Sequence, residues 1–573
     1  MANTSTTSLR DAYAARAISQ VPRLLSLQDR NQFSPTYGSF DRTYWLDKTE
    51  DFPNALPQFG VLTLALVYRH EFAGSIYRGQ PKIRDWAIAG MDYWASLQHK
   101  DGSFDEFYPY ERGWAGPSAF TTYANLEAYR LLKDEMPQEV AQRVLGAARK
   151  AARFIAKGES EQDLLANHHA VASLAVWKAY EILGDADLKA GFQGLLQGFL
   201  KLHNAEEGWS REYDGVDPGY LSATVSFLSK IYQTNPDPKI LEVLRQSVEF
   251  CSYFAYPNGF YGGSMGSRNT MHFYPHGFEI MAGQVPMAAS VAEHMLKALS
   301  EGKLVPPEIM ADRYLFYRVP ELLQAYLDYS ARPAALPLLP YQREPGTRYF
   351  PAARVYTATL PGHYVVANLA KGGVVKVFDK ATGRLILNDC GVIGKLDNGK
   401  VVTTQWVDPT YECQTDDTGW QVSGHLNIVP SNKLFSPLKM IIFRAVLIAL
   451  GWSPRLSHFM KGSIRKSLML GNRPAPVAFR RSFRFDGDGV TLEDEIRLEG
   501  NVKFQSLSIG DEFFVRYVPQ SRYFQSQELE VKGTPFDSGQ LAKLNRERHI
   551  TIGQRVALAG LPTASTHAPR LHS

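Results

Sequence analysis

The sequence predicts a multidomain α+β protein in which an N-terminal (α/α) toroid, an incomplete barrel of helical hairpins, precedes an antiparallel β-sandwich. Three observations predict this fold. Apolar residues recur at intervals of three and four from about residue 8 to residue 330, as in amphipathic helices. After residue 350, short runs alternate between apolar and polar residues, as in half-buried strands. Between these regions, residues 331–350 (ARPAALPLLPYQREPGTRYF) are rich in proline, which ends helices.

These changes of pattern set the expected domain boundaries. We expect the toroid over residues 1–335, a linker over 336–350, the sandwich over 351–560 and a disordered tail over 561–573. At 573 residues the chain is too long for a single core, so at least two domains are needed. Hydrophobic residues at 45% and charged residues at 21% are typical of a soluble globular protein.

Within the toroid, one kind of turn returns three times, as KDGSF at 100–104, EEGWS at 206–210 and PNGFY at 257–261. Each turn follows an aromatic-rich helix and sets a glycine just past the end of that helix, a position that favours glycine. Gly102 and Gly208 are 106 residues apart, and Gly208 and Gly259 are 51 apart, which indicates a helical hairpin of about 50 residues as the repeating unit. Such hairpins close into a toroid with a central cleft, or stack as an open solenoid.

In the sandwich, runs such as RVYTATL, HYVVANLA and GVTLEDEIRL are separated by Gly, Asn and Asp, which predicts antiparallel strands. Residues 418–485 break this rhythm with eleven Lys or Arg and no Asp or Glu, so the rest of a chain of net charge +4 carries −7. The apolar stretch 434–452 is too short, and too interrupted by Arg444, to span a bilayer. We expect an amphipathic helix in an insertion over 433–472. It either contacts an anionic membrane or polymer, or packs on the sandwich with solvated charges.

Composition also argues against several classes of function. A net charge of +4 without a recognised binding module does not indicate nucleic acid as a partner. The three cysteines lack the spacing of a disulfide framework or a zinc site, and there is no phosphate-binding glycine loop, so we expect no metal and no cofactor. The N-terminus lacks the basic and apolar regions of a signal peptide. We therefore expect a cytoplasmic protein, with peripheral contact at the inner membrane face as an alternative.

The residues that indicate chemistry begin at Asn167, His168 and His169, which open a long apolar helix, and end at Tyr220, which closes the loop GWSREYDGVDPGY. Abstracting a proton next to a carboxylate builds negative charge, which fixed donors such as an Asn amide and a His N–H stabilise. A nearby Tyr hydroxyl can exchange protons with the substrate. These groups suit β-elimination from a uronic acid. Asn167 could instead be the N-cap of its helix, one imidazole of the pair is expected to face the cleft, and Tyr213 is the alternative to Tyr220.

This arrangement resembles the heparinase II/III-like and alginate-lyase-like polysaccharide lyases. The resemblance covers about residues 40–560: an Asn-His pair heads a toroid helix, a Tyr follows 53 residues later on its loop, and a sandwich begins with a segment like residues 350–373. It implies that Asn167 and His168 neutralise the uronate carboxylate and that Tyr220 acts as acid and base.

Two further segments carry candidate substrate-binding residues. In the Gly-rich segment 262–279, an Arg would grip a carboxylate with both of its donors. The resemblance implies a further catalytic residue in this part of the chain, which we take to be His272, with His276 as the alternative. The aromatic and charged loop 101–123 fits sugar stacking at the mouth of the toroid. The expected substrate-binding residues are His169, Arg268, Asn269, His276, Tyr213, Glu212, Tyr108, Glu111, Arg112 and Trp114.

We therefore expect a polysaccharide lyase that cleaves a uronic-acid-containing polysaccharide or oligosaccharide by β-elimination, in exopolysaccharide metabolism or biosynthesis. Three alternatives stay open. A uronyl C5-epimerase would use the same carbanion and return the proton from the other face. An (α/α) glycoside hydrolase would pair a carboxylate of the loop 101–123 with Glu212 or Asp217. A non-catalytic glycan-binding protein would keep the toroid without the chemistry.

Overall fold

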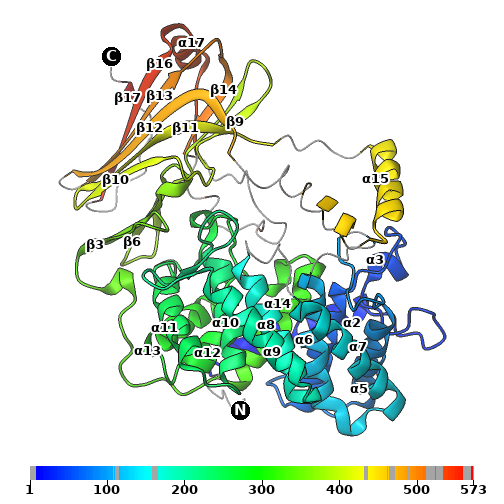
Figure 1. Ribbon diagram of the computed structural model, residues 1–573. Coiled ribbons are helices and arrows are strands. Elements are labelled where there is room, and N and C mark those ends of the chain that lie inside the picture. The colour runs from blue at the N-terminus through cyan, green and yellow to red at the C-terminus, as the bar shows by residue number, and fades with distance from the viewer. Residues whose placement is uncertain are drawn as a thin grey trace, which may run out of the picture.

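The protein has a helix-rich N-terminal region followed by a C-terminal region of antiparallel sheets (Figure 1). This description rests on a computed structural model. The residues that it describes are 8–107, 109, 115–157, 165–430, 436–453, 455–457, 459–460, 463, 472–486, 489–510, 523, 529, 533–558 and 570–571.

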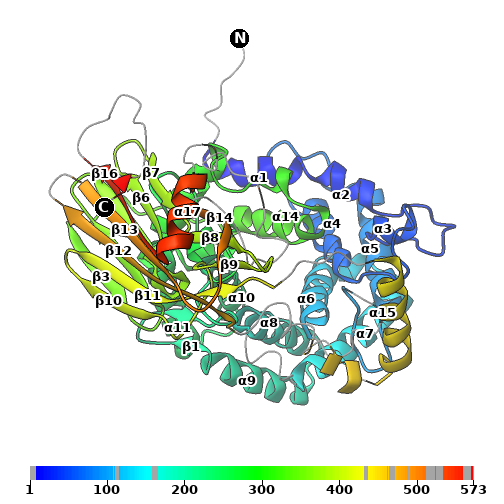
Figure 2. The same ribbon diagram turned by 90° about the horizontal axis from the view of Figure 1, so that it is seen from above.

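The inner helices of the N-terminal region form a closed ring within the described part of the chain (Figure 2). Helix α4 packs on α6, α6 on α8, α8 on α10, α10 on α12, α12 on α14, and α14 returns to α4. The ring closure favours the toroid over the open solenoid. The first four intervals between helix starts are 51 to 58 residues, which agrees with the expected hairpin period. These helices are α4 (Gly60–Arg69), α6 (Ala115–Leu132), α8 (Ala166–Leu183), α10 (Pro218–Tyr232), α12 (His276–Met281) and α14 (Asp312–Leu327).

A second layer of helices covers the ring from outside, each packed on its hairpin partner. Helix α7 shows the pattern: its buried residues Val144, Ala147, Ala148, Ala151 and Ile155 fall on one face at helical spacing. The inner helix α8 is buried over most of its length, because neighbours surround it. The outer helices are α1 (Asp11–Ile18), α5 (Pro81–Ser96), α7 (Gln138–Ala156), α9 (Ala186–Leu200), α11 (Pro238–Ser252) and α13 (Pro286–Ser300), with α2 (Val21–Leu27) and α3 (Arg42–Trp45) beside α4 and α5.

The three glycine turns occupy equivalent positions, each between an outer helix and the next inner helix. Gly102, Gly208 and Gly259 have φ of +96°, +86° and +83°, a left-handed conformation that favours glycine. A Cβ at Gly102 would overlap the backbone of Lys150 on α7, and one at Gly208 would overlap the backbone of Gln246 on α11. Each turn therefore fixes one hairpin against the next outer helix.

The C-terminal region contains two antiparallel sheets among the described residues. The first has the order β3-β4-β5-β6-β7, and the larger has the order β15-β14-β8-β9-β11-β12-β13-β16-β17, with β10 beside β11. The strands of the first are β3 (Gly346–Phe350), β4 (Val355–Thr359), β5 (His363–Asn368), β6 (Val374–Asp379) and β7 (Leu385–Asp389). The larger contains β8 (Val392–Leu396), β9 (Val401–Thr403), β10 (Glu412–Asp416), β11 (Gly419–Ile428), β12 (Pro474–Asp486), β13 (Gly489–Leu498), β14 (Phe504–Ile509), β15 (Thr534–Pro535), β16 (His549–Ala557) and β17 (Arg570–Leu571).

The five-stranded sheet lies between the helices and the larger sheet (Figure 1). Val355, Tyr364 and Val366 join the core of the helical region. Their neighbours Tyr356 and Val365 join the core shared with the larger sheet. Both faces of the inner strands β4 and β5 are therefore buried, so these strands show no alternation of buried and exposed residues.

Two boundaries differ from those expected. Strand β3 begins at Gly346, inside the expected linker 336–350, because its residues pair with β4. Arg570 and Leu571 pair with β16, inside the expected disordered tail. Helix α15 (Pro437–Leu450) lies inside the expected insertion 433–472, whereas a second helix among the strands, α17 (Ser538–Glu547), was not expected. Within the described ranges, every helix is too short or too polar to cross a membrane.

Candidate active site

Asn167 lies in the first turn of α8, where Glu212 holds it. The backbone N–H of Asn167 donates to Oε1 of Glu212, and its side-chain Nδ2 donates to Oε2, each at 2.7 Å. The N-cap position belongs to Leu165, so Asn167 is not the cap that the alternative interpretation required. Glu212 instead accepts one of the free N–H groups of the helix start, where a negative charge is favourable. The Asn167 amide is therefore fixed in one orientation.

Glu212 reaches this position because its backbone forms isolated β-bridges with Leu165 and Gly215. Its side chain is only 1% exposed. Burial raises the pKa of Glu212 to about 8, although the two Asn167 donors and the Arg268 charge act in the opposite direction. A buried carboxyl that titrates near neutral pH and holds a candidate catalytic amide is a feature typical of active sites.

Tyr220 lies at the start of α10, and Asp217 connects it to the Gly-rich segment. Asp217 caps α10 by accepting the backbone N–H of Tyr220 at 3.1 Å, and it also accepts the backbone N–H of Arg268 at 2.9 Å. A Cβ at Gly219 would overlap Thr270, which explains the glycine in the sequence DPGY. The two loops are thus locked together, and the side chains that they carry are held in one region.

Arg268 and Tyr213 form the most unusual pair of this region. The guanidinium carbon lies 3.6 Å from the centre of the Tyr213 ring. Arg268 is fully buried, and none of its guanidinium nitrogens has a hydrogen-bond partner within the described ranges. Tyr213 has a φ of +60°, which is strained for a tyrosine. A buried cation without a hydrogen-bonded partner is costly, so this arrangement is suited to receive an anionic group.

The two histidines at the start of α8 point in different directions. The His168 ring is partly exposed and meets Phe120 edge-on, with ring centres 6.2 Å apart. The His169 ring packs against α9, because a Cβ at Gly198 would lie 2.8 Å from its Cε1. His169 therefore lies between an inner and an outer helix, away from the loops that carry Tyr213 and Arg268, and we no longer count it among the substrate-binding residues.

The other residues of the Gly-rich segment have structural partners. Lys371 of the sheet region donates to Oδ1 of Asn269 at 2.6 Å and to the backbone oxygens of Ser264 and Gly266. The Asn269 side chain therefore anchors its own loop to the sheet. His272 is buried with its ring centre 5.2 Å from that of Tyr523. Neither the Asn269 side chain nor the His272 ring lies where we would expect a substrate contact.

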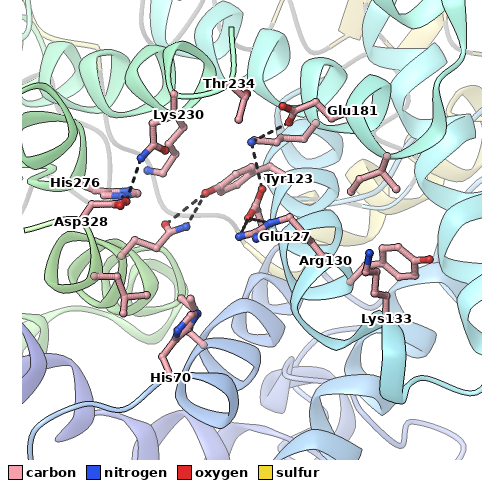
Figure 3. A pocket seen from close by; sticks show the side chains of 17 residues that line it. His70, Tyr123, Glu127, Arg130, Lys133, Glu181, Lys230, Thr234, His276 and Asp328 are labelled. Atoms are coloured by element: carbon pink, nitrogen blue, oxygen red, sulfur yellow. Dashed lines mark hydrogen bonds and ion pairs between the residues drawn. The ribbon is translucent and has the colours of Figure 1, made fainter. Parts of the chain in front are cut away.

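His276 lines a different cavity, of about 800 Å³, at the far ends of the inner helices (Figure 3). Its Nε2 lies 2.5 Å from Oδ2 of Asp328. The same cavity is lined by Lys178, which follows Asn167 by eleven residues on α8 and so lies about 16 Å further along the helix. Burial lowers the pKa of His276. The structure therefore separates His276 from Arg268, which the sequence had grouped with it.

A group of aromatic side chains near His168 was not identified from the sequence. Tyr317 packs on Phe120 with ring centres 4.9 Å apart, and Arg318 lies 4.6 Å from the centre of the Tyr274 ring.

Burial raises the pKa of Tyr220 well above its usual value, and the nearby Tyr213, Tyr314 and Asp217 add to this shift. The expected contacts Tyr108, Glu111, Arg112 and Trp114 lie outside the described residues.

Comparison with known proteins supports a common fold with polysaccharide lyases. Residues 75–299 match the family model of the ulvan lyase N-terminal domain. A Streptomyces coelicolor A3 chondroitin AC lyase solved with chondroitin sulphate is 13% identical, with a TM-score of 0.50, over 89% of this chain and 69% of that chain. A Paenibacillus xanthan lyase is 12% identical, with a TM-score of 0.50, over 88% of this chain and 47% of that chain. No curated protein matches the sequence. The resemblance to polysaccharide lyases that the sequence indicated is thereby confirmed.

Proposed function

We propose that the chain cleaves a uronic-acid-containing polysaccharide by β-elimination, because part of it matches the ulvan lyase N-terminal domain model and its fold is that of polysaccharide lyases. The observation that carries this proposal is the Arg268 guanidinium, buried without a hydrogen-bond partner among the described residues. It lies against Tyr213, its charge acts on the Glu212 that orients the Asn167 amide, and Asp217 connects its loop to Tyr220. This is a site for a carboxylate next to groups that can move protons.

We assign the carboxylate-binding role to Asn167, His168 and Arg268. Nδ2 of Asn167 has two hydrogens, and Glu212 accepts only one of them. The second is available to the substrate carboxylate, whose negative charge grows as the C5 proton leaves. Glu212 acts as a positioning residue rather than as the substrate contact expected from the sequence, because it is buried beneath the amide.

Tyr220 is assigned the proton transfer. The proton at C5 passes to a tyrosine phenolate, that of Tyr220 or of Tyr213, the electron pair of the C–H bond forms the C4–C5 double bond, and the C4–O bond breaks as the Tyr220 phenol gives a proton to the leaving oxygen. Burial keeps the Tyr220 phenol protonated, which suits donation to the leaving oxygen. Tyr213, whose ring lies against the Arg268 guanidinium, is the alternative proton acceptor at C5. His272 is not included, because it is buried against Tyr523.

One alternative keeps specific support. Two tyrosines on one loop could serve opposite faces of the sugar, which is what a uronyl C5-epimerase requires. The hydrolase alternative loses support, because Asp217 is fully buried and holds two loops, and Glu212 is bound to Asn167. Neither carboxyl group is placed to activate a water molecule.

The test is incubation of the purified protein with a panel of uronate polymers in deuterated buffer. Ultraviolet absorbance follows the unsaturated uronate, and mass spectrometry follows deuterium at C5. Rising absorbance with any polymer supports the lyase. Deuterium uptake without absorbance supports the epimerase and rejects elimination. Isothermal titration that detects binding of a polymer giving neither signal would support a non-catalytic glycan-binding protein.

A further inference from the structure

Helix α15 carries an apolar surface that the proposed activity does not use. The helix leaves the larger sheet between β11 and β12 and lies beside α3 in both views (Figures 1 and 2). Arg444 fastens it there, with an ion pair of 3.0 Å to Asp51 and a contact of 5.4 Å to the centre of the Phe52 ring. Leu447 is the buried residue of the helix. One side of α15 is therefore docked on the helical region.

A neighbouring side of α15 is apolar and exposed. Leu438, Ile441, Ile448 and Trp452 follow each other at intervals that place them on one helix face, and each is between 64 and 67% exposed. Nine of the sixteen exposed large hydrophobic residues of the described chain lie within residues 438–459. Such a concentration exceeds the scattered exposure that is normal on a protein surface, and it marks an interaction surface.

The charge of the segment indicates what covers this surface. Residues 418–485 contain eleven Lys or Arg and no Asp or Glu, and three of these, Arg480, Arg481 and Arg484 on β12, pair with acidic residues of the sheets. Lys439 on α15 and Arg455 after it are exposed, and neither forms an ion pair with an acidic group in the described ranges. A second copy of this chain would bring like charges together across a symmetric contact, which is unfavourable. The headgroups of anionic lipids supply the opposite charge, and their acyl region accepts the apolar side chains.

We propose that α15 and Trp452 bind the surface of an anionic lipid bilayer, with α15 parallel to the membrane plane. The 14 residues of α15 span about 21 Å, which suits an interfacial helix and is too short for a span. Trp452, at the end of the helix, is the residue type that favours the lipid–water interface. The contact is independent of the lyase chemistry and is tested by binding alone.

The test is co-sedimentation of the full chain with phosphatidylcholine vesicles that contain or lack phosphatidylglycerol. We expect binding to the anionic vesicles that weakens as salt is raised. The double variant Ile441→Asp and Ile448→Asp should lose at least tenfold in partition. The matched control, Ile76→Asp with Leu338→Asp, changes two exposed apolar residues elsewhere and should bind like the unchanged chain. Thermal unfolding of both variants should match the unchanged chain, because all four positions are exposed.

Three outcomes would overturn the proposal. The first is failure of the unchanged protein to bind anionic vesicles. The second is equal loss of binding in both double variants. The third is a concentration-dependent dimer, seen by analytical ultracentrifugation, that the α15 variant abolishes, since this would assign the surface to a second copy of the chain.

Discussion

Replacement of Glu212 by Gln tests how the site is held together. Glu212 accepts two N–H groups of Asn167, one on each oxygen. A Gln has one acceptor oxygen, so its NH2 group must face the other donor. The Asn167 amide can relieve this conflict only by turning over, which presents an oxygen where the donor was. Above pH 8, where Glu212 is ionised and both of its oxygens accept, we expect kcat to fall about 100-fold, the usual effect of losing one fixed donor to a developing negative charge.

The same variant has a pH signature. The folded pKa of Glu212 is raised from 4.5 to about 8, so its contribution to stability is present below about pH 4.5 and is lost as pH rises to 8. The loss is at most about 5 kcal/mol. In the Gln variant this group does not titrate. The free energy of unfolding of the variant should therefore rise relative to the unchanged protein across this window.

The assays are initial rates of unsaturated uronate formation and chemical denaturation at a series of pH values. Glu206→Gln is the control, because Glu206 is an exposed carboxylate nearby in the chain. It should leave both kcat and the pH dependence of stability unchanged. Suppose that Glu212→Gln removes the pH dependence of the free energy of unfolding but leaves kcat unchanged. Glu212 would then be merely buried and would not orient a catalytic group.

Three further predictions concern single contacts. Tyr220→Phe should lower kcat at least 1,000-fold with the unfolding midpoint unchanged, and if Tyr213→Phe has the larger effect on initial rates, the proton transfer belongs to Tyr213. Arg268→Leu should raise KM at least tenfold while the free energy of unfolding stays the same or rises, because a buried cation is removed; an unchanged KM would reject the carboxylate site. Gly219→Ala should destabilise the protein by about 1–3 kcal/mol in denaturant unfolding, because the added Cβ has no room. The control Gly146→Ala, in an open position of α7, should stabilise the protein by about 0.5–1 kcal/mol. Equal effects of the two substitutions would contradict the proposed close packing at Gly219.

Much of the fold follows from periodicity. The glycine of each repeated turn predicted a hairpin unit, and Gly102 and Gly208 show why: each turn needs a left-handed residue and has no space for a side chain. The change from helical to alternating patterns located the sheets. The sequence did not show that the first sheet is buried on both faces, since this depends on which layers meet.

The site was less predictable, for identifiable reasons. Asn167 and Tyr220 could be found because each stands at the start of an apolar helix. Glu212 lies in a polar loop, where an acid is normally solvated, and only its β-bridge to Leu165 buries it beside Asn167. His276 was grouped with Arg268 because they are eight residues apart, but the chain turns between them and carries His276 to the other cavity.

The attachment of the Gly-rich loop to the sheets limits how this chain could be divided. Lys371 and Asn368, from the first sheet, bind backbone oxygens of the loop that carries Arg268. The helical ring therefore is not a portable catalytic module. A fragment ending near residue 335 would contain every proposed catalytic side chain, yet it would lack the groups that hold one of them in place. Exchange of sheet regions between related proteins should succeed only where these two contacts are kept.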